Sequence, residues 1–326
     1  MNRFSLQTLS TRISTFRKTF SLKEYFPILL LIGLCIIFTI ITPRFFQFRN
    51  FMIISQQAVV LLVTALGMTF VIIGGSIDLS VGSQVALSAL VAALFSRSIG
   101  IAAIIPACLV GSLCGFINGI IFAKGKVPSF IATMGGLVVY RGVVLFVTRG
   151  APVEITNGMF LSVYSGRTVG IPHSVIVTVF IVIITAIIFN NTPFGREVRA
   201  IGGGERVAIL TGLKVDKIKI MMYTLAGLLC GLAGLLQSAR VFAATAQLGE
   251  GMELDVIASV VLGGTPLTGG VGSIQGTILG TLIITVLSNG MNMMGLSPYI
   301  QYIIKGAVLV LAVFATIDRT KIGIIK

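Results

Sequence analysis

Three charged side chains fall within or at the edge of long apolar runs, and their chemistry needs explaining first. Arg141 and Lys305 lie inside such runs, and Asp78 lies at the edge of one. Charged groups in lipid are costly, and they mark ion paths, proton relays or substrate paths. Two simpler interpretations stay open: Arg141 could extend toward its helix end, and Asp78 could cap the following helix. We expect no carboxylate near the middle of a run, which argues against a proton-coupled carrier.

Uncharged amides in the same runs offer a second chemistry, because they can hydrogen-bond a polar solute without the cost of a charge. The candidates for a translocation path are Asp78, Gln84, Asn118, Arg141 and Asn289. Gln237 and Asn292 are residues of the same kind. The alternative for each amide is a bond between two helices, worth about 0.6 kcal/mol.

Neither catalysis nor nucleotide binding is expected of this chain. A phosphate-binding loop needs the pattern GxxxxGK[ST], and the nearest stretch, at 125–127, lacks the first glycine and the hydroxyl. His173 is the single histidine, so neither a nucleophile–base pair nor a histidine-based metal site is expected. The four cysteines fall in apolar runs without a C-x-x-C spacing, which indicates packing. We therefore assign no catalytic residue, metal or cofactor.

The segment 190–219 is the longest polar stretch between runs, and it carries charges of both signs. It contains GGGERVAILTG at 202–212, which predicts a short helix over 205–211 ended by Gly212. An ordinary linker is the alternative, but charges mixed with apolar residues are better suited to docking on a partner. The residues selected for that contact are Gly202, Gly203, Glu205, Arg206, Ala208, Gly212 and Lys214.

The composition shows which elements must position these residues. Of 326 residues, 56% are hydrophobic and 10% are charged, and the mean hydropathy is +1.04. A soluble domain carries about 25% charged residues, so we expect an all-α membrane protein, a polytopic bundle of about ten transmembrane helices. The expected spans are 27–42, 51–73, 83–97, 99–123, 127–148, 173–189, 220–241, 255–271, 273–291 and 298–316.

Two of these spans are weak, so eight or nine crossings remain an alternative. The segment 83–97 is short, and 255–271 is interrupted by four glycines and a proline. Backbone groups freed by a broken helix are tolerated only beside protein or a water-filled cavity. We therefore predict a discontinuous element near Gly263 and Gly264 that faces the bundle interior and acts as a gate on the periplasmic side.

Lysine and arginine predict the orientation. With the N-terminus inside, the cytoplasm receives sixteen basic residues and the outside receives six, which fits the positive-inside rule with both termini cytoplasmic. The expected divisions are a cytoplasmic segment at 1–26, a transmembrane domain at 27–316 with a cytoplasmic loop at 190–219, and a cytoplasmic tail at 317–326. Because the basic residues lie between apolar runs, the net charge of +14 does not indicate nucleic-acid binding.

The two halves of the chain echo one another. GGSIDLSVGS at 74–83 is similar to GGTPLTGGVGS at 263–273, and further pairs link 118–142 with 289–306. The two sets of pairs differ in offset by about one span. Halves with an odd number of spans must have opposite orientations, so we expect an inverted repeat.

Four motifs together resemble the membrane permeases of ribose-type monosaccharide importers driven by ATP-binding cassettes (ABC importers). They are GGSIDLSVGS at 74–83, PSFIAT at 128–133 with Arg141-Gly142, GGGERVAILTGLKV at 202–215 and ELDVIASVVLGGT at 253–265. The resemblance covers roughly residues 50–316 in the same order. It departs at Ser76, where the family usually has glycine.

The resemblance implies a multi-pass permease of the bacterial inner membrane. Its implied partners are cytoplasmic ATPase subunits that use ATP, an extracytoplasmic sugar-binding protein and a second permease copy or paralogue. It also implies that 202–214 is the coupling segment. The alternatives are an ABC permease for another solute, a branched-chain amino acid or a furanose signal, and, from another class, a self-sufficient secondary carrier.

Overall fold

The computed structural model describes residues 22–316, so the expected N-terminal segment and C-terminal tail lie almost wholly outside the described residues. Within them the chain is mostly helical. The helices are α2 (Leu22–Ile41), η1 (Pro43–Phe46), α3 (Phe48–Ile73), α4 (Val81–Ile99), η2 (Gly100–Ala103), α5 (Ile104–Ala123), α6 (Ser129–Thr148), α7 (Gly158–Ser165), α8 (His173–Asn191), α9 (Pro193–Gly203), α10 (Glu205–Leu210), α11 (Val215–Val241), α12 (Met252–Leu262), α13 (Ile274–Met293) and α14 (Pro298–Thr316). Two pairs of short antiparallel strands complete it: β1 (Val153–Glu154) with β4 (Ala243–Ala244), and β2 (Arg167–Thr168) with β3 (Ile171–Pro172).

Six stretches of the described chain are long and apolar enough to cross a membrane. They are 48–73, 81–123, 129–148, 173–191, 215–241 and 274–293, and two shorter apolar helices lie at 26–41 and 298–311. The 81–123 stretch contains two helices, α4 and α5, which the 3-10 turn η2 separates and which pack against each other. The chain is thus a helical protein with several membrane-spanning elements.

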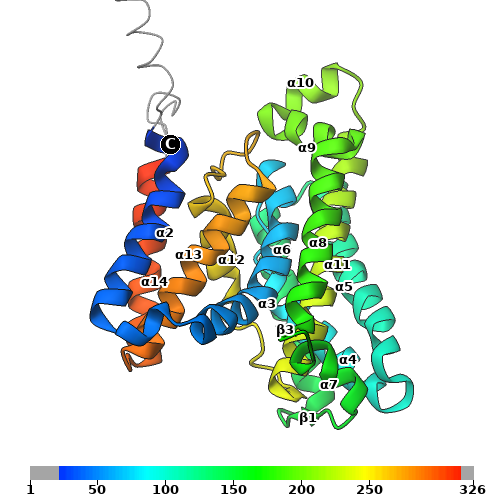
Figure 1. The fold of residues 1–326 in the computed structure, drawn as a ribbon. Coiled ribbons are helices and arrows are strands. Elements are labelled where there is room, and N and C mark those ends of the chain that lie inside the picture. The colour runs from blue at the N-terminus through cyan, green and yellow to red at the C-terminus, as the bar shows by residue number, and fades with distance from the viewer. Residues whose placement is uncertain (1–21, 317–326) are drawn as a thin grey trace, which may run out of the picture.

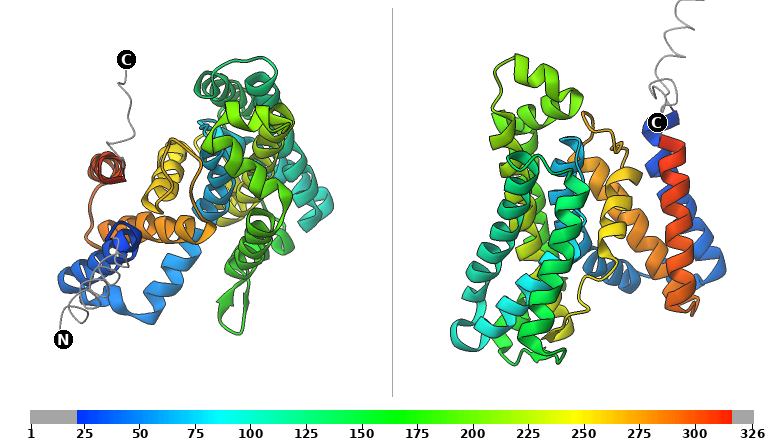
Figure 2. Two further views of the ribbon diagram at one scale, coloured as in Figure 1. Left: turned by 90° about the horizontal axis from the view of Figure 1, so that it is seen from above. Right: turned by 180° about the vertical axis from the view of Figure 1, so that it is seen from behind.

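The long helices run side by side, and the two ends of the molecule differ (Figure 1). One end carries α9 and α10, together with the start of α2 and the end of α14. The other end carries α7, β1 and β3. The views from above and from behind place α14 at the side of the molecule (Figure 2), where it packs mainly on α12 and α13.

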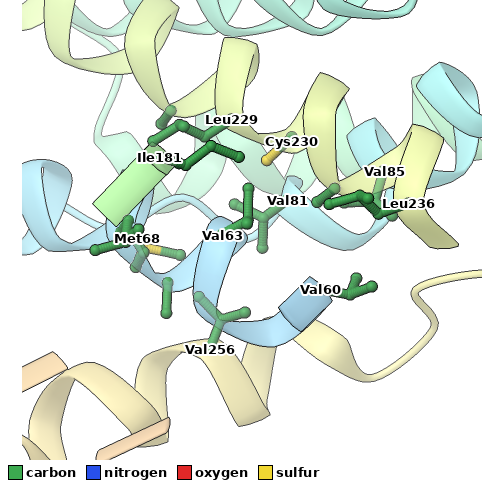
Figure 3. Close-up of a cluster of buried hydrophobic side chains, with 14 of the residues drawn as sticks. Val60, Val63, Met68, Val81, Val85, Ile181, Leu229, Cys230, Leu236 and Val256 are labelled. Atoms are coloured by element: carbon green, nitrogen blue, oxygen red, sulfur yellow. The ribbon is translucent and has the colours of Figure 1, made fainter. Parts of the chain in front are cut away.

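The main apolar core joins α3, α4, α8, α11 and α12. Figure 3 shows Val63 and Met68 of α3 beside Val81 of α4, Cys230 of α11 and Val256 of α12. Lipid provides no hydrophobic drive between helices, so close approach of backbones must supply contact energy.

Glycines spaced four residues apart provide that close approach: Gly111, Gly115 and Gly119 in α5, and Gly276 and Gly280 in α13. A Cβ added at Gly111 of α5 would lie 2.2 Å from the carbonyl oxygen of Gly227 in α11. One added at Gly280 of α13 would lie 1.8 Å from the carbonyl oxygen of Ser259 in α12. Each pair of helices therefore packs backbone against backbone.

The glycine motifs at 74–83 and 263–273 each end a helix in the same way. Both of these helix ends lie at the same end of the molecule. Gly74 donates to Phe70 at the end of α3, and Gly263 donates to Ser259 at the end of α12, 3.0 and 3.1 Å from nitrogen to oxygen. The turns that follow touch, because Gly270 donates to the carbonyl of Ile73 at 2.8 Å. An inverted pair would lie at opposite ends, so this match does not support inversion, and the repeat stays a prediction.

Candidate functional site: a buried network, a polar pocket and an exposed helix

Asp78 starts a buried network of polar side chains at the beginning of α4. One carboxylate oxygen accepts from the backbone nitrogen of Ser80 at 2.9 Å and from its hydroxyl at 2.5 Å. The other accepts from the amide of Gln84 at 3.1 Å. A side-chain carboxylate that accepts from the backbone N–H two residues later forms an Asx turn, here directly before α4. The N-terminus of a helix also favours a nearby negative charge.

The network reaches two neighbouring helices. The amide of Asn118 in α5 donates to the hydroxyl of Ser80 at 2.8 Å, and Tyr140 of α6 donates to Asn118 at 2.9 Å. Asp78, Gln84 and Asn118 are all completely buried. Three of the candidate path residues are thus brought together, in an arrangement that ties α4, α5 and α6 together.

Arg141 holds a non-helical stretch of chain within the bundle. It lies in the middle of α6, and its guanidinium donates to the backbone carbonyls of Ala246 and, at 2.7 Å, Leu248. These residues belong to the irregular segment between β4 and α12. Carbonyls without a helical partner must be satisfied internally in a membrane protein. Arg141 therefore supports this segment, and the bonds place its head group there, not at the helix end.

The expected break near Gly263 and Gly264 is present, and the side of the membrane that it faces stays a prediction. The helix α12 ends at Leu262, and residues 263–273 are non-helical before α13 begins. This turn lies against α9, since a Cβ at Gly202 would be 2.5 Å from the nitrogen of Gly270. The turn therefore lies at the same end as the predicted cytoplasmic segment. The helix α11 leads from that end to the opposite one and α12 leads back, so the turn after α12 lies near α9 again.

A pocket of about 360 Å³ lies toward the opposite end. Its lining includes the last turn of α11 (Arg240), the last turn of α13 (Asn292) and the first turn of α14 (Pro298, Gln301). Its polar lining residues are Gln57, Gln237, Arg240, Glu250, Asp255, Thr285, Ser288, Asn292, Gln301, Tyr302 and Lys305. The side-chain oxygen of Gln237 is buried without a hydrogen-bond partner among the described residues.

An ion pair joins two walls of this pocket. The amine of Lys305 in α14 lies 2.7 Å from a carboxylate oxygen of Asp255 in α12, and both side chains are about one-quarter exposed. Asp255 lies in the first turn of α12, so the pair does not contradict the expectation that no carboxylate lies near the middle of a run. Lys305 is therefore not an isolated charge, because Asp255, fifty residues away in sequence, neutralises it.

None of the selected path residues lines the pocket. Asn289 is buried on α13, one residue from the lining Ser288, and its side-chain oxygen has no partner among the described residues. Sequence reasoning had noted the lining residues Gln237, Asn292 and Lys305 without assigning them to a site. Glu250, Asp255 and Gln301 were missed, and only the convergence of α11 to α14 shows that they share one space.

The short helix predicted at 205–211 is α10, and Gly212 ends it with φ of +84°. Its surface is apolar and exposed: Val207, Ile209 and Leu210 are all more than half exposed. Arg206, Gly203 and Lys214 are exposed as well. This exposed apolar surface on a polar segment agrees with the predicted docking role, which stays a prediction.

Two residues selected for the contact have other roles. Ala208 is 3% exposed, so its side chain packs under α10 and cannot face a partner. Glu205 pairs with Lys219 of α11 at 2.7 Å, and the lysine side chain is only 8% exposed. Replacing Glu205 would leave the nearly buried Lys219 without its carboxylate partner. The effect of such a variant on packing could then not be separated from its effect on docking.

The arrangement is that of a transport protein: membrane-spanning helices, a polar pocket and an exposed helix on one end. Residues 50–313 match the family described as the branched-chain amino acid transport system permease component, and the chain belongs to that family. It is 44% identical to the ribose import permease protein of Bacillus subtilis (strain 168), over 90% of this chain and 92% of that protein. It is 40% identical to the ribose import permease protein of Escherichia coli (strain K12), over 97% and 99%.

A third relative is named for a different sugar. The galactose/methyl galactoside import permease protein of Haemophilus influenzae is 34% identical over 91% of this chain and 93% of that protein. No solved structure matches the chain.

Proposed function

We propose that this chain is the permease subunit of an ABC importer that moves a monosaccharide, ribose or a related pentose or hexose, across the bacterial inner membrane. The observation that carries the proposal is the identity of 40–44% to ribose import permeases over at least nine-tenths of both chains. The pocket agrees in chemistry, because amide, carboxylate and ammonium groups donate and accept hydrogen bonds as sugar hydroxyls require.

The partners follow from the class of protein. Cytoplasmic ATPase subunits would use ATP, and an extracytoplasmic binding protein would deliver the sugar. A second permease copy or paralogue would complete the membrane part. In this proposal α9 and α10 face the cytoplasm, so the polar pocket opens toward the outside.

The proposed topology has ten crossings with both termini cytoplasmic. The crossings are α2, α3, α4, α5, α6, α8, α11, α12, α13 and α14. In this count the short helix α12 and the irregular segment before it together make one crossing. The start of α2 and the end of α14 lie at one end of the molecule, as an even count requires.

The proposed mechanism is alternating access. The pocket receives sugar from the binding protein, and the turns at 74–80 and 263–273 close the other end of the bundle. ATP binding moves the docked ATPases, and α10 passes that movement to the bundle. The permease needs little sugar affinity of its own, since the binding protein supplies it.

A substrate competition tests the sugar against the amino acid that the family's description names. The complete complex in proteoliposomes should take up radiolabelled ribose or a related monosaccharide, and unlabelled leucine should not compete. Leucine uptake with no monosaccharide uptake would replace the sugar proposal by the amino-acid alternative.

A further inference from the structure

Three segments that are distant in sequence meet at one point with no side chain between them. The carbonyl of Ile73 ends α3 and accepts from the nitrogen of Gly270, in the turn after α12, at 2.8 Å. Gly202, in the last turn of α9, lies against both. A Cβ added there would be 1.7 Å from the Ile73 oxygen and 2.5 Å from the Gly270 nitrogen.

The contact extends to each side of this point. A Cβ at Gly269 would lie 2.8 Å from the backbone of Gly75, and one at Gly270 would lie 3.0 Å from the Cα of Gly203. The backbones of all three segments are therefore in van der Waals contact. We call this contact, made by residues 73–75, 202–203 and 269–270, the glycine junction.

The glycine junction is close in the chain to the exposed helix α10. Only Gly204 separates α9 from α10, and α10 is attached to α11 through Glu205 and Lys219. At the other end of α9, the ring of Phe194 stacks on Phe70 of α3 at 5.8 Å. The helix α9 is thus held against α3 at both ends.

Two interrupted elements of the bundle start from this junction. The turn at 74–80 leads into α4, and the turn at 263–273 leads from α12 into α13. A backbone contact without intervening side chains cannot relax by a change of rotamer. The helix α9 therefore cannot shift toward either turn unless that turn moves or the contact opens.

We propose that Gly202 is a positioning residue that transmits movement of α9 and α10 to the two turns that close this end of the permease. The inference rests on the proposed function, since it needs an ATPase that moves α10. The close contact itself requires glycine at this position, although its backbone is helical.

Gly135 of α6 provides a matched control, because it is also helical and a Cβ there meets nothing within 4 Å. In the complete complex, Gly202→Ala should lower ATP-dependent sugar uptake by about tenfold, within the range of energetic coupling between sites. It should also abolish the stimulation of ATP hydrolysis by sugar-loaded binding protein. Co-purification of the ATPase should stay normal, because the surface of α10 is unchanged. Gly135→Ala should behave as wild type in all three measurements.

A second matched pair covers the case in which Gly202→Ala fails to assemble. Gly269 and Gly170 have similar positive φ of +79° and +81°, so alanine strains both backbones alike. Only at Gly269 does the added Cβ meet another segment. Gly269→Ala should therefore uncouple hydrolysis from uptake, and Gly170→Ala, between β2 and β3, should not.

Equal behaviour within both pairs, with wild-type uptake intact, would overturn the junction and leave the proposed function standing. Loss of the assembled complex in both crowded variants would show that the contact is structural, and would overturn the inference as well. A wild-type complex that takes up no sugar with ATP would instead contradict the proposed function.

Discussion

At the scale of single residues, the ion pair of Asp255 and Lys305 has the clearest consequence. Its partial exposure places its worth between about 1 kcal/mol for a surface pair and about 3–5 kcal/mol for breaking a buried one. Asp255→Asn should lower the thermal stability of the purified permease, because it leaves an unpaired lysine in the pocket wall. The double variant Asp255→Asn with Lys305→Gln should recover most of that loss. A double variant less stable than either single variant would show that the two groups do not act as a pair.

Arg141 offers a second test at this scale. Arg141→Gln removes the guanidinium nitrogen, Nη1, that donates to two backbone carbonyls, so the irregular segment before α12 should loosen. Unfolding stability should fall by about 1–3 kcal/mol, the cost of unsatisfied buried polar groups, and protease cleavage near 245–251 should increase. Arg149→Gln, at the exposed end of the same helix, should change neither. Equal effects of the two substitutions would exclude a specific support role for Arg141.

At the scale of elements, α10 should bind the ATPase through its apolar surface. Leu210→Asp places a charge on a side chain that is 80% exposed, so the permease should fold normally but co-purify at least tenfold less ATPase, a loss typical of an interface hot spot. Val169→Asp is the control, because Val169 is 96% exposed between β2 and β3 at the opposite end. Undiminished co-purification of Leu210→Asp would remove α10 from the interface.

The packing of α5 on α11 can be tested with a matched pair of glycines. Gly111→Ala inserts a Cβ 2.2 Å from a carbonyl oxygen of α11 and should destabilise the bundle by about 1–3 kcal/mol. Gly142→Ala, on α6, meets nothing within 4 Å and should be neutral or stabilise by up to about 1 kcal/mol. Thermal unfolding in detergent measures both. A Gly111→Ala variant as stable as Gly142→Ala would contradict the close contact.

The elements were predictable where apolar runs end at charges or glycines. The helices α5, α6 and α14 match the expected spans closely, since a long apolar run has one stable form in lipid. The expected span 255–271 is helical only to Leu262, because the glycines form a turn that packs on α3 and α9. The end of the molecule at which this turn lies depends on the irregular segment before α12. The hydrophobic periodicity of the sequence does not predict that segment.

The candidate site was predictable only where it is local in sequence. The helix at 205–211 and its end at Gly212 follow from a single motif. The polar pocket gathers residues from Gln57 to Lys305, and their convergence depends on how α3, α11, α12, α13 and α14 pack. The partner of Lys305 lies fifty residues away, so the sequence showed the charge but not its neutralisation.

At the scale of the whole molecule, the two ends have different chemistry. One end combines the exposed α10, the glycine junction and the two glycine turns. The other is reached by the polar pocket and carries the short strands. A permease driven from one side and loaded from the other needs this polarity, since alternating access requires two distinct states and a ligand that favours one of them.

The most direct test of the account is sugar uptake by proteoliposomes of defined composition. The permease with ATPase subunits, sugar-loaded binding protein and ATP should accumulate ribose or the related sugar that it carries. Omitting the ATPase, or replacing ATP with a non-hydrolysable analogue, should reduce uptake to the level of empty liposomes. Sugar uptake by the permease alone, driven by an ion gradient or by the sugar's own gradient, would contradict the account.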